Sequence, residues 1–340
     1  MRVGIVLNRP HPRLRTLGKR ALTAGYELAR GRGTGGDMVL PEFDGFAWLL
    51  DGDPLVLGSD SPLDSRALAR CDVPLVMFPG PLDRFWRELD PRDLPVHWEA
   101  LRASDAIGVM LRDTAGFYAA LAPGAHVFHL PVPVDVERFA GLALAAAART
   151  DGPVLLTAPT RFCGPASQLP ITTFLAFAEL RRRHPRLDGL CFCYDDEERR
   201  QTEAMVERLG LAGAVEVRSF VRPLGRFLDL VKHCRLGISL PHAMIQGRTA
   251  LVCAALGIPL VVSDDVETHR ALYPQTSVRW YDVAGAAALA ARLLDDTAFA
   301  AGVRDTASAA VEYYTPGRAR ARLAAAVEAV RGGRAVREGA

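Results

Sequence analysis

The sequence predicts an α/β protein built from two doubly wound parallel sheets. Short apolar runs bounded by turn residues recur along the 340 residues and alternate with longer segments of helical periodicity. This alternation is typical of parallel strands joined by crossover helices. A chain of this length suits two domains better than one core. The composition, with 49% hydrophobic and 24% charged residues, is that of a folded protein rather than a disordered one.

Two series of expected strands divide the chain. The first series comprises residues 3–7, 55–57, 75–78, 107–110 and 127–130. The second comprises residues 154–158, 190–194, 215–217, 237–240, 259–263 and a weaker 277–280. An Ala-rich connection that ends at 149–152 separates the two series and restarts the rhythm of strand and helix.

We therefore expect three parts. They are an N-terminal domain over 1–145, a second domain over 150–316 and a C-terminal helix over 317–332. Thr315-Pro316 has the pattern of a helix start, because proline suits the first turn. Leu323, Val327 and Val330 follow at helical spacing and predict one buried stripe on this last helix.

The helix expected after the first strand of the second series ends in a run of arginines. Ile171, Phe174, Leu175 and Ala178 have the spacing of one helix face, which predicts that this face is buried. The helix should end within 181–185, Arg-Arg-Arg-His-Pro, because cations are favoured at a helix C-terminus. We interpret the triple arginine as a solvated helix end rather than a phosphate site.

Bulk charge and cysteine spacing exclude several classes of function. The formal net charge is only +2, so neither nucleic acid nor an anionic membrane is an expected partner. The six cysteines, at 71, 163, 191, 193, 234 and 253, form no C-x-x-C pair of the kind that a zinc site or redox motif needs. Cys191 and Cys193 lie in an apolar run, which predicts buried free thiols. The chain shows no signal-peptide layout and no apolar run of about 18 residues, so we expect a cytoplasmic protein with no integral membrane segment.

Several short motifs in the second half follow one another in a familiar order. They are the segment 129–139 (HLPVPVDVERF), Pro159-Thr160-Arg161, Leu209-Gly210-Leu211 with 215–221, the segment 237–241 (GISLP) and the segment 254–264 (AALGIPLVVSD). Over roughly 131–272 this series resembles the donor domain of GT-B glycosyltransferases, specifically the retaining glycosyltransferase group 1 (GT4-like) family with its E-x7-E motif. The first 120 residues share with that family only the strand rhythm and the segment 76–80 (VMFPG).

The resemblance implies a fold, a reaction and partners. The fold is GT-B, two Rossmann-like domains facing a cleft, with the acceptor on the first and the donor on the second. The reaction is transfer of a sugar from a nucleotide-activated donor to a small-molecule acceptor, with retention and without a metal. The nucleotide sugar is then a co-substrate, and no other cofactor is expected. The sequence leaves the oligomeric state open.

The chain departs from the family pattern at four polar positions. When the chain is aligned on Gly257-Ile258-Pro259, the two family glutamates fall on Met244 and Val252, and neither side chain can bond a sugar hydroxyl. The usual diphosphate lysine falls near Gln168, and the first-domain histidine falls on Pro79. This pattern keeps open a catalytically degenerate GT-B homologue that binds nucleotide or a partner protein, and also a GT-B sugar isomerase or epimerase, because fold does not fix reaction.

Arginine and a helix start are the candidate ligands of the donor diphosphate. Arg161 follows an expected strand at its carboxyl end, where open α/β sheets bind ligands, and a guanidinium suits phosphate oxygens. The alternative is an exposed loop arginine. Gly247-Arg248-Thr249 opens an apolar helix, so its amides and positive dipole end would face an anion. An ordinary helix start with an outward arginine is the other interpretation. Arg248 would then supply the charge that Gln168 lacks.

His242 and Asp60 are the candidate catalytic residues. His242 follows an expected strand and could contact hydroxyls of donor or acceptor, although a loop histidine is often just exposed. Asp60 ends a first-half strand and could orient an acceptor nucleophile, or it is an ordinary turn residue before Pro62.

Two further motifs match known binding patterns in letters alone. Residues 31–36 match a dinucleotide fingerprint but lie between a helix and a strand-like run, the reverse of the required order. Asp51-Gly52-Asp53 matches a metal-binding D-x-D, yet Asp-Gly is a routine turn. We predict no metal site.

Overall fold

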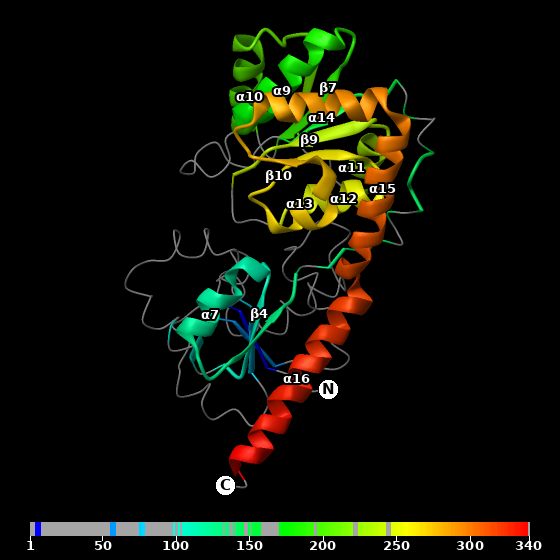
Figure 1. Ribbon diagram of the computed structural model, residues 1–340. Coiled ribbons are helices and arrows are strands. Elements are labelled where there is room, and N and C mark those ends of the chain that lie inside the picture. The colour runs from blue at the N-terminus through cyan, green and yellow to red at the C-terminus, as the bar shows by residue number, and fades with distance from the viewer. Residues whose placement is uncertain are drawn as a thin grey trace. The chain divides into compact units, whose positions relative to one another are not determined.

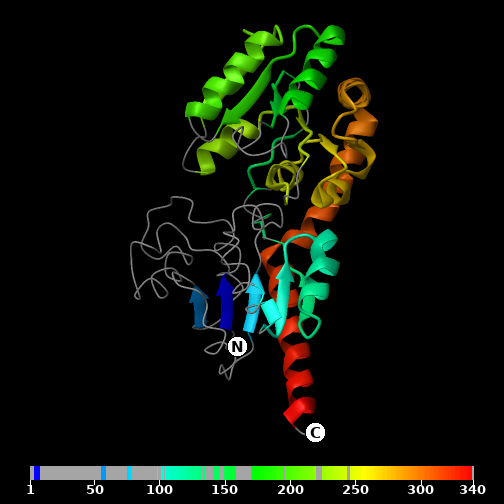
Figure 2. The ribbon, with the colours of Figure 1, turned by 90° about the vertical axis from the view of Figure 1, so that its left-hand side faces the viewer.

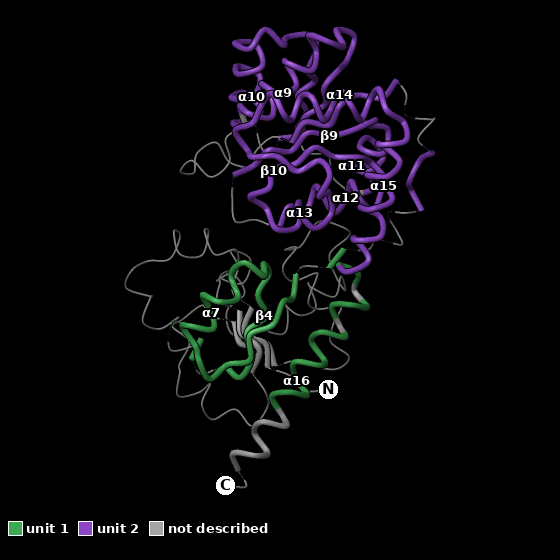
Figure 3. Tube along the Cα trace, viewed as in Figure 1, with its two compact units in different colours: residues 1–134, 314–340 green, residues 135–313 purple. Residues whose placement is uncertain are grey.

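A computed structural model gives the structure of the protein. It describes residues 4–7, 55–58, 75–78, 98, 101–102, 104–131, 133–134, 136, 139, 141–145, 149, 151–157, 170–193, 196–219, 224–242 and 246–338. The chain divides into two compact units (Figure 3). Unit 1 comprises residues 1–134 and 314–340, and unit 2 comprises 135–313. The domain limits that the sequence suggests, at 145–150 and 316–317, stay a prediction.

Unit 1 contains a parallel five-stranded sheet. Its strands are β1 (Gly4–Leu7), β2 (Leu55–Gly58), β3 (Leu75–Phe78), β4 (Ala106–Val109) and β5 (His126–His129), in the order β2-β1-β3-β4-β5. Between β4 and β5 lie the 3-10 helix η2 (Arg112–Thr114) and helix α7 (Ala115–Leu121). All four strand pairings are parallel, as the apolar runs predict.

The C-terminal helix α16 (Pro316–Glu338) completes unit 1 by packing on β4 and β5 (Figure 2). Its predicted stripe is confirmed, since Leu323, Val327 and Val330 are all buried. Ala319 and Ala326 are buried on the same helix and let it approach the sheet closely.

Unit 2 contains a parallel six-stranded sheet with the order β11-β10-β9-β6-β7-β8. Its strands are β6 (Val154–Leu156), β7 (Gly189–Cys193), β8 (Val215–Ser219), β9 (Leu236–Ser239), β10 (Leu260–Ser263) and β11 (Ser277–Val278). The residues of β6, β9 and β10 are all buried. Strands covered on both faces explain why these segments are continuous apolar runs rather than alternating ones.

Helices cover both faces of this sheet (Figure 1). They are α9 (Pro170–Arg183), α10 (Asp196–Arg208), α11 (Leu224–Val231), α12 (Arg248–Ala255), α13 (Glu267–Leu272), α14 (Val283–Asp295) and α15 (Thr297–Val311), with short 3-10 turns η4 (Pro274–Thr276) and η5 (Glu312–Tyr314). Helix α14 lies along α9, and α15 packs on α12 and α13. Among the helices within the described ranges, none is both long enough and apolar enough to cross a bilayer.

The predicted buried face of α9 is partly wrong. Ile171 is 40% exposed, whereas Phe174, Phe177 and Leu180 are fully buried. The buried stripe is therefore rotated toward Phe177, because both faces of this apolar helix offered a plausible stripe and packing against α14 decided between them. The helix ends at Arg183 as predicted, and Arg181 donates a hydrogen bond to the Pro185 carbonyl beyond it.

Candidate functional site

The sheet of unit 2 reverses its strand order between β6 and β9. From β6 the order runs through β7 to β8 on one side, and from β9 through β10 to β11 on the other. Thr157 directly follows β6, Ser239 is the last residue of β9, and the Thr157 hydroxyl donates to the Ser239 hydroxyl over 2.8 Å. Ligands of open α/β sheets bind beyond the carboxyl ends of strands at such a reversal. This edge is therefore the candidate site.

The loop that leaves β9 is fixed from both sides. The Leu240 amide donates to the Thr173 hydroxyl of α9 over 3.2 Å. On the other side, the Ser263 hydroxyl at the end of β10 donates to the Pro241 carbonyl over 2.5 Å. His242 thus emerges from backbone that two neighbouring elements hold in place, which is how a scaffold pre-organises a binding residue.

His242 contacts two side chains that follow other strands. Its Nδ1 lies 2.5 Å from Oδ2 of Asp265, two residues beyond β10. Its ring stacks on Trp280, beyond β11, with centroids 5.0 Å apart and an angle of 28° between the planes. The His242 side chain is 52% exposed and that of Asp265 is 23% exposed. The imidazole is therefore oriented by its partners yet open to a ligand.

The start of helix α12 requires a glycine. Gly247 adopts a left-handed conformation, with φ 67° and ψ 48°, in which a side chain is strained. A Cβ there would lie 2.7 Å from Nε2 of the buried His269. Because glycine has no side chain, it offers no cap to the first amides of α12. The Ala250 amide donates to the Gly247 carbonyl over 2.9 Å, and the positive end of the helix dipole favours an anion at this helix start. Arg248 is exposed and Thr249 half-buried at the same helix start.

The other end of α12 is held by a buried arginine. Arg149 is 4% exposed, and its Nη1 donates to the Gly257 carbonyl over 2.5 Å. Its Nη2 donates to the Leu256 carbonyl over 2.7 Å and also to the Leu144 carbonyl. Leu256 and Gly257 directly follow the last turn of α12, where a cation is favoured by the dipole. Leu144 and Arg149 are thereby linked to the helix that begins at the candidate site.

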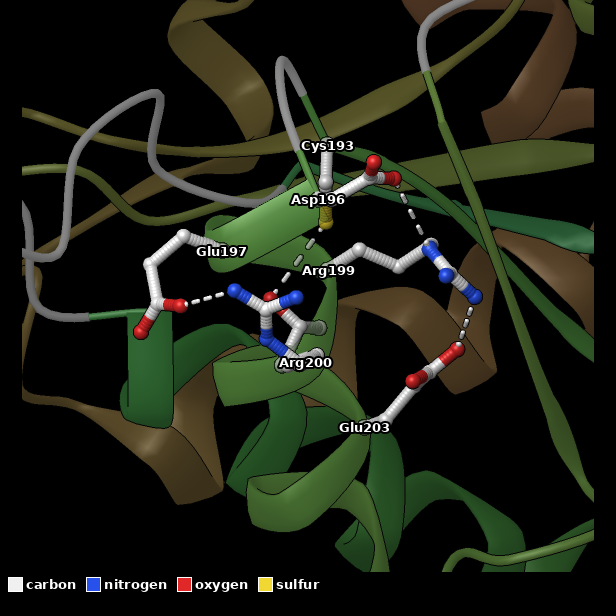
Figure 4. Close-up of polar contacts among 7 residues, drawn as sticks. Cys193, Asp196, Glu197, Arg199, Arg200 and Glu203 are labelled. Atoms are coloured by element: carbon white, nitrogen blue, oxygen red, sulfur yellow. Dashed lines mark hydrogen bonds and ion pairs between the residues drawn. The ribbon is translucent and has the colours of Figure 1, made fainter.

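Helix α10 carries a second charged cluster near the end of β7, but its charges are paired along the helix (Figure 4). Arg199 bonds Glu203 over 3.0 Å and lies 3.6 Å from Asp196, and Arg200 lies 2.5 Å from Glu197. Such exposed pairs at helical spacing support the helix modestly. Because each of these arginines faces a carboxylate, this cluster is a poor anion site.

The prediction that Cys191 and Cys193 are buried free thiols is confirmed. Cys191, Cys193, Cys234 and Cys253 are all buried and free. A hydrogen bond with Cys191 holds the pKa of Cys193 below its usual value, while the Cys193 thiol lies 3.4 Å from the Thr202 hydroxyl (Figure 4). Burial raises the pKa of Cys234 to about 12, so this thiol stays protonated and unreactive.

Two histidines, the buried His269 and the half-buried His129, have lowered pKa values. Burial lowers the pKa of His269, which packs against Gly247, to about 3. Burial and Arg112 lower the pKa of His129, at the end of β5, to about 4. Arg112 Nε donates to His129 Nδ1 over 3.2 Å, and Nε2 lies 3.1 Å from the Met110 carbonyl, so the neutral ring is fully bonded.

We expect acid to destabilise the protein through these two rings. An unfolded histidine titrates near 6.5, so below that pH the unfolded state binds more protons than the folded one. The free energy of unfolding should then fall as the pH drops from 6.5 toward 4, by up to about 1.4 kcal/mol per pH unit for each ring. In His269→Gln, the free energy of unfolding measured with urea should change less steeply with pH, by about 1.4 kcal/mol per pH unit at most. His126→Gln, at an exposed position, is the matched control. Equal slopes in wild type and His269→Gln would contradict the assignment.

The structure covers four of the seven predicted site residues. His242, Gly247, Arg248 and Thr249 all follow β9, and Gly247 with its successors forms the start of α12 as expected. The predicted ligands Arg161 and Gln168 and the predicted catalytic Asp60 lie outside the described residues, as does Met244. Val252 lies half-buried on α12. Asp265 and Trp280 were missed. Asp265 follows an expected strand, which is the signal that identified His242, whereas Trp280 was expected to be the last residue of the strand over 277–280.

Comparison with known proteins identifies the fold. No family model matches the sequence, and no curated protein matches it either. Among solved structures, the chain is similar to a UDP-forming α,α-trehalose-phosphate synthase from Burkholderia xenovorans, with 16% identity and a TM-score of 0.65 over 92% of this chain and 80% of that one. It is also similar to the sucrose-phosphate synthase of Thermosynechococcus elongatus, with 16% identity and a TM-score of 0.63 over 82% and 74% of the two chains.

A third similar structure is that of trehalose-6-phosphate from E. coli bound with UDP-2-fluoro glucose, with 14% identity and a TM-score of 0.66 over 96% and 99% of the two chains. At these identities the likeness shows the fold. The predicted fold class, two doubly wound parallel-sheet domains of the GT-B type, is confirmed.

Proposed function

We propose that this protein is a glycosyltransferase that moves a sugar from a nucleotide-activated donor, held by unit 2, to a small-molecule acceptor, held by unit 1. One observation carries the proposal. Helix α12 follows the strand-order reversal of unit 2 and the fixed loop of His242, and it begins after Gly247, which provides no side-chain cap. A pre-organised anion site at a sheet edge suits a diphosphate. The similar structures include a UDP-forming synthase and a complex with UDP-2-fluoro glucose.

The chemistry at this edge is electrostatic. As the bond between the anomeric carbon and the diphosphate oxygen breaks, negative charge grows on the leaving diphosphate. The first amides of α12, with Arg248 and with Arg161 from the loop after β6, would stabilise that charge without reorganising. Gln168 would add a neutral hydrogen bond. No protein nucleophile is needed for this stabilisation. The retention that the family resemblance implies then requires that the acceptor hydroxyl attack the face of the sugar from which the diphosphate leaves.

The acceptor side of the proposal depends on unit 1. Asp60 follows β2, and its carboxylate would orient the attacking hydroxyl by accepting a hydrogen bond. This role is tested by Asp60→Asn, which should lower kcat while leaving nucleotide affinity unchanged, since the donor binds elsewhere.

The test of the function is a survey of nucleotide sugars with acceptors, in which both binding and product are followed. Formation of a glycosylated product with release of the nucleoside diphosphate supports the proposal. Nucleotide binding without any turnover would favour the degenerate homologue. Such a result would be consistent with the apolar Val252 on α12, which stands where the resembling family has a glutamate. A change in the sugar without an acceptor would point to an isomerase or epimerase.

We expect the transferase activity to survive chelation. Arginines and helix amides supply the positive charge that a metal supplies in D-x-D enzymes, so removal of divalent cations should leave the rate unchanged within about twofold. The measurement is product formation with EDTA against buffer. Activity lost in EDTA and restored by manganese or magnesium would refute metal independence.

A further inference from the structure

His242 presents one defined nitrogen to a ligand. A carboxylate oxygen can only accept a hydrogen bond, so the 2.5 Å contact with Asp265 requires that Nδ1 carry the proton. In the neutral form of the ring, the lone pair is therefore on Nε2. Trp280, stacked on the ring, limits its rotation. The ring is thus held as a hydrogen-bond acceptor at the edge where the loop is fixed by Ser263 and Thr173.

The neighbouring carboxylate has a different partner. Oδ2 of Asp264 lies 3.4 Å from Nε of Arg279, and Arg270 donates to the Asp264 carbonyl. The two consecutive aspartates therefore have different partners. Asp264 binds arginine and fixes the segment after β10, whereas Asp265 bonds the imidazole.

The acceptor nitrogen selects the kind of ligand group. A lone pair on Nε2 attracts a hydroxyl hydrogen and repels the oxygens of phosphate or carboxylate, which carry no proton at neutral pH. The diphosphate proposed for the start of α12 therefore cannot donate a hydrogen bond to Nε2. A hydroxyl of the sugar attached to that diphosphate can. We propose that His242 recognises a hydroxyl of the donor sugar and that Asp265 is its positioning residue. This inference rests on the nucleotide-sugar function proposed above.

The test separates the sugar from the nucleotide. UDP and UDP-glucose, together with GDP and GDP-mannose, are titrated by calorimetry into wild type, His242→Phe, His242→Gln, Asp265→Asn and Asp264→Asn, with folding checked by thermal melts. The quantity compared is the affinity for the nucleotide sugar divided by the affinity for its nucleoside diphosphate. We expect this ratio to fall about five- to tenfold in His242→Phe, the worth of one hydrogen bond. In His242→Gln, the amide oxygen can lie near the position that Nε2 occupies in wild type, so this variant should keep most of the affinity ratio.

The aspartate variants test the positioning role. Asp265→Asn should lower the ratio severalfold because its amide can either accept from or donate to Nδ1, and Asp264→Asn should leave the ratio unchanged. On the ligand-free protein at pH 8, 15N NMR should show His242 in the Nδ1-H form in wild type and in Asp264→Asn, and a mixture of both forms in Asp265→Asn. The His242 signals are assigned by their absence in His242→Gln.

Each outcome decides something. A wild-type His242 in the Nε2-H form, or a ratio that His242→Phe leaves unchanged while the nucleoside diphosphate still binds, would overturn this inference and leave the transferase proposal intact. Failure of every nucleoside diphosphate to bind the folded wild type would overturn both.

Discussion

Replacing Arg149 by Met should lower the free energy of unfolding by about 3–5 kcal/mol. Three carbonyls, those of the buried Leu256 and the half-buried Leu144 and Gly257, share this guanidinium, and Met leaves them without this donor. Each unsatisfied buried carbonyl costs about 1–3 kcal/mol, and the favourable charge at the C-terminus of α12 is lost as well. The measurement is urea unfolding followed by circular dichroism.

The control variants separate charge from geometry. Arg149→Lys keeps the charge but not the planar fork, so it should recover only part of the loss. Arg182→Met is the matched control, because the Arg182 side chain is 78% exposed and forms an ion pair with Glu179 on its own helix. Its stability should change by less than about 0.5 kcal/mol. An equal unfolding midpoint in Arg149→Met and Arg182→Met would show that Arg149 does not hold α12.

Replacing either Arg161 or Arg248 by Ala should weaken nucleotide binding at least about tenfold. Charge-assisted hydrogen bonds to phosphate contribute about 1.5–3 kcal/mol each. The lysine that binds the diphosphate in the family that this chain resembles falls near Gln168, so the two arginines would supply the positive charge. The two effects should be less than additive, because groups that share one ligand are coupled. Titration of UDP and GDP into each single variant and the double variant measures both quantities.

Arg182→Ala is again the control, because that exposed residue lies at the end of α9 and should not affect binding. Affinities that are equal in Arg161→Ala, Arg248→Ala and Arg182→Ala would remove the proposed diphosphate site. That result would favour a protein that does not transfer sugars. Folding of each variant is confirmed by thermal melt before its affinity is interpreted.

The strands could be predicted from the sequence because burial on both faces leaves a simple pattern. Segments such as those of β9 and β10 consist of apolar residues on both faces, and each lies within one or two residues of its expected limits. The buried face of α9 could not be predicted fully, because Ile171 and Phe177 are equally apolar and only packing distinguishes them. Strand β11 ends at Val278, earlier than expected, since Trp280 leaves the sheet to stack on His242.

The candidate site was predictable only in part for a similar reason. His242 and the start of α12 were found because they follow a strand and open a helix, which are local signals. The partners of His242 are Asp265 and Trp280, which lie 23 and 38 residues further along the chain, and nothing in the sequence pairs them. The need for Gly247 likewise depends on the close approach of His269, a tertiary contact.

The chain leaves unit 1 and returns to it at neighbouring residues. Unit 1 ends its first part at Val134 and resumes at Tyr314, and the Val134 amide donates to the Tyr314 carbonyl over 2.8 Å. In topological terms, unit 2 is an insertion of one continuous segment into unit 1, between two residues that are already neighbours. Domains whose ends lie close together tolerate such insertion, since the host needs little rearrangement to accept the guest. Unit 2, for which donor binding is proposed, is thus one continuous inserted segment, and a short linker between 134 and 314 would close unit 1.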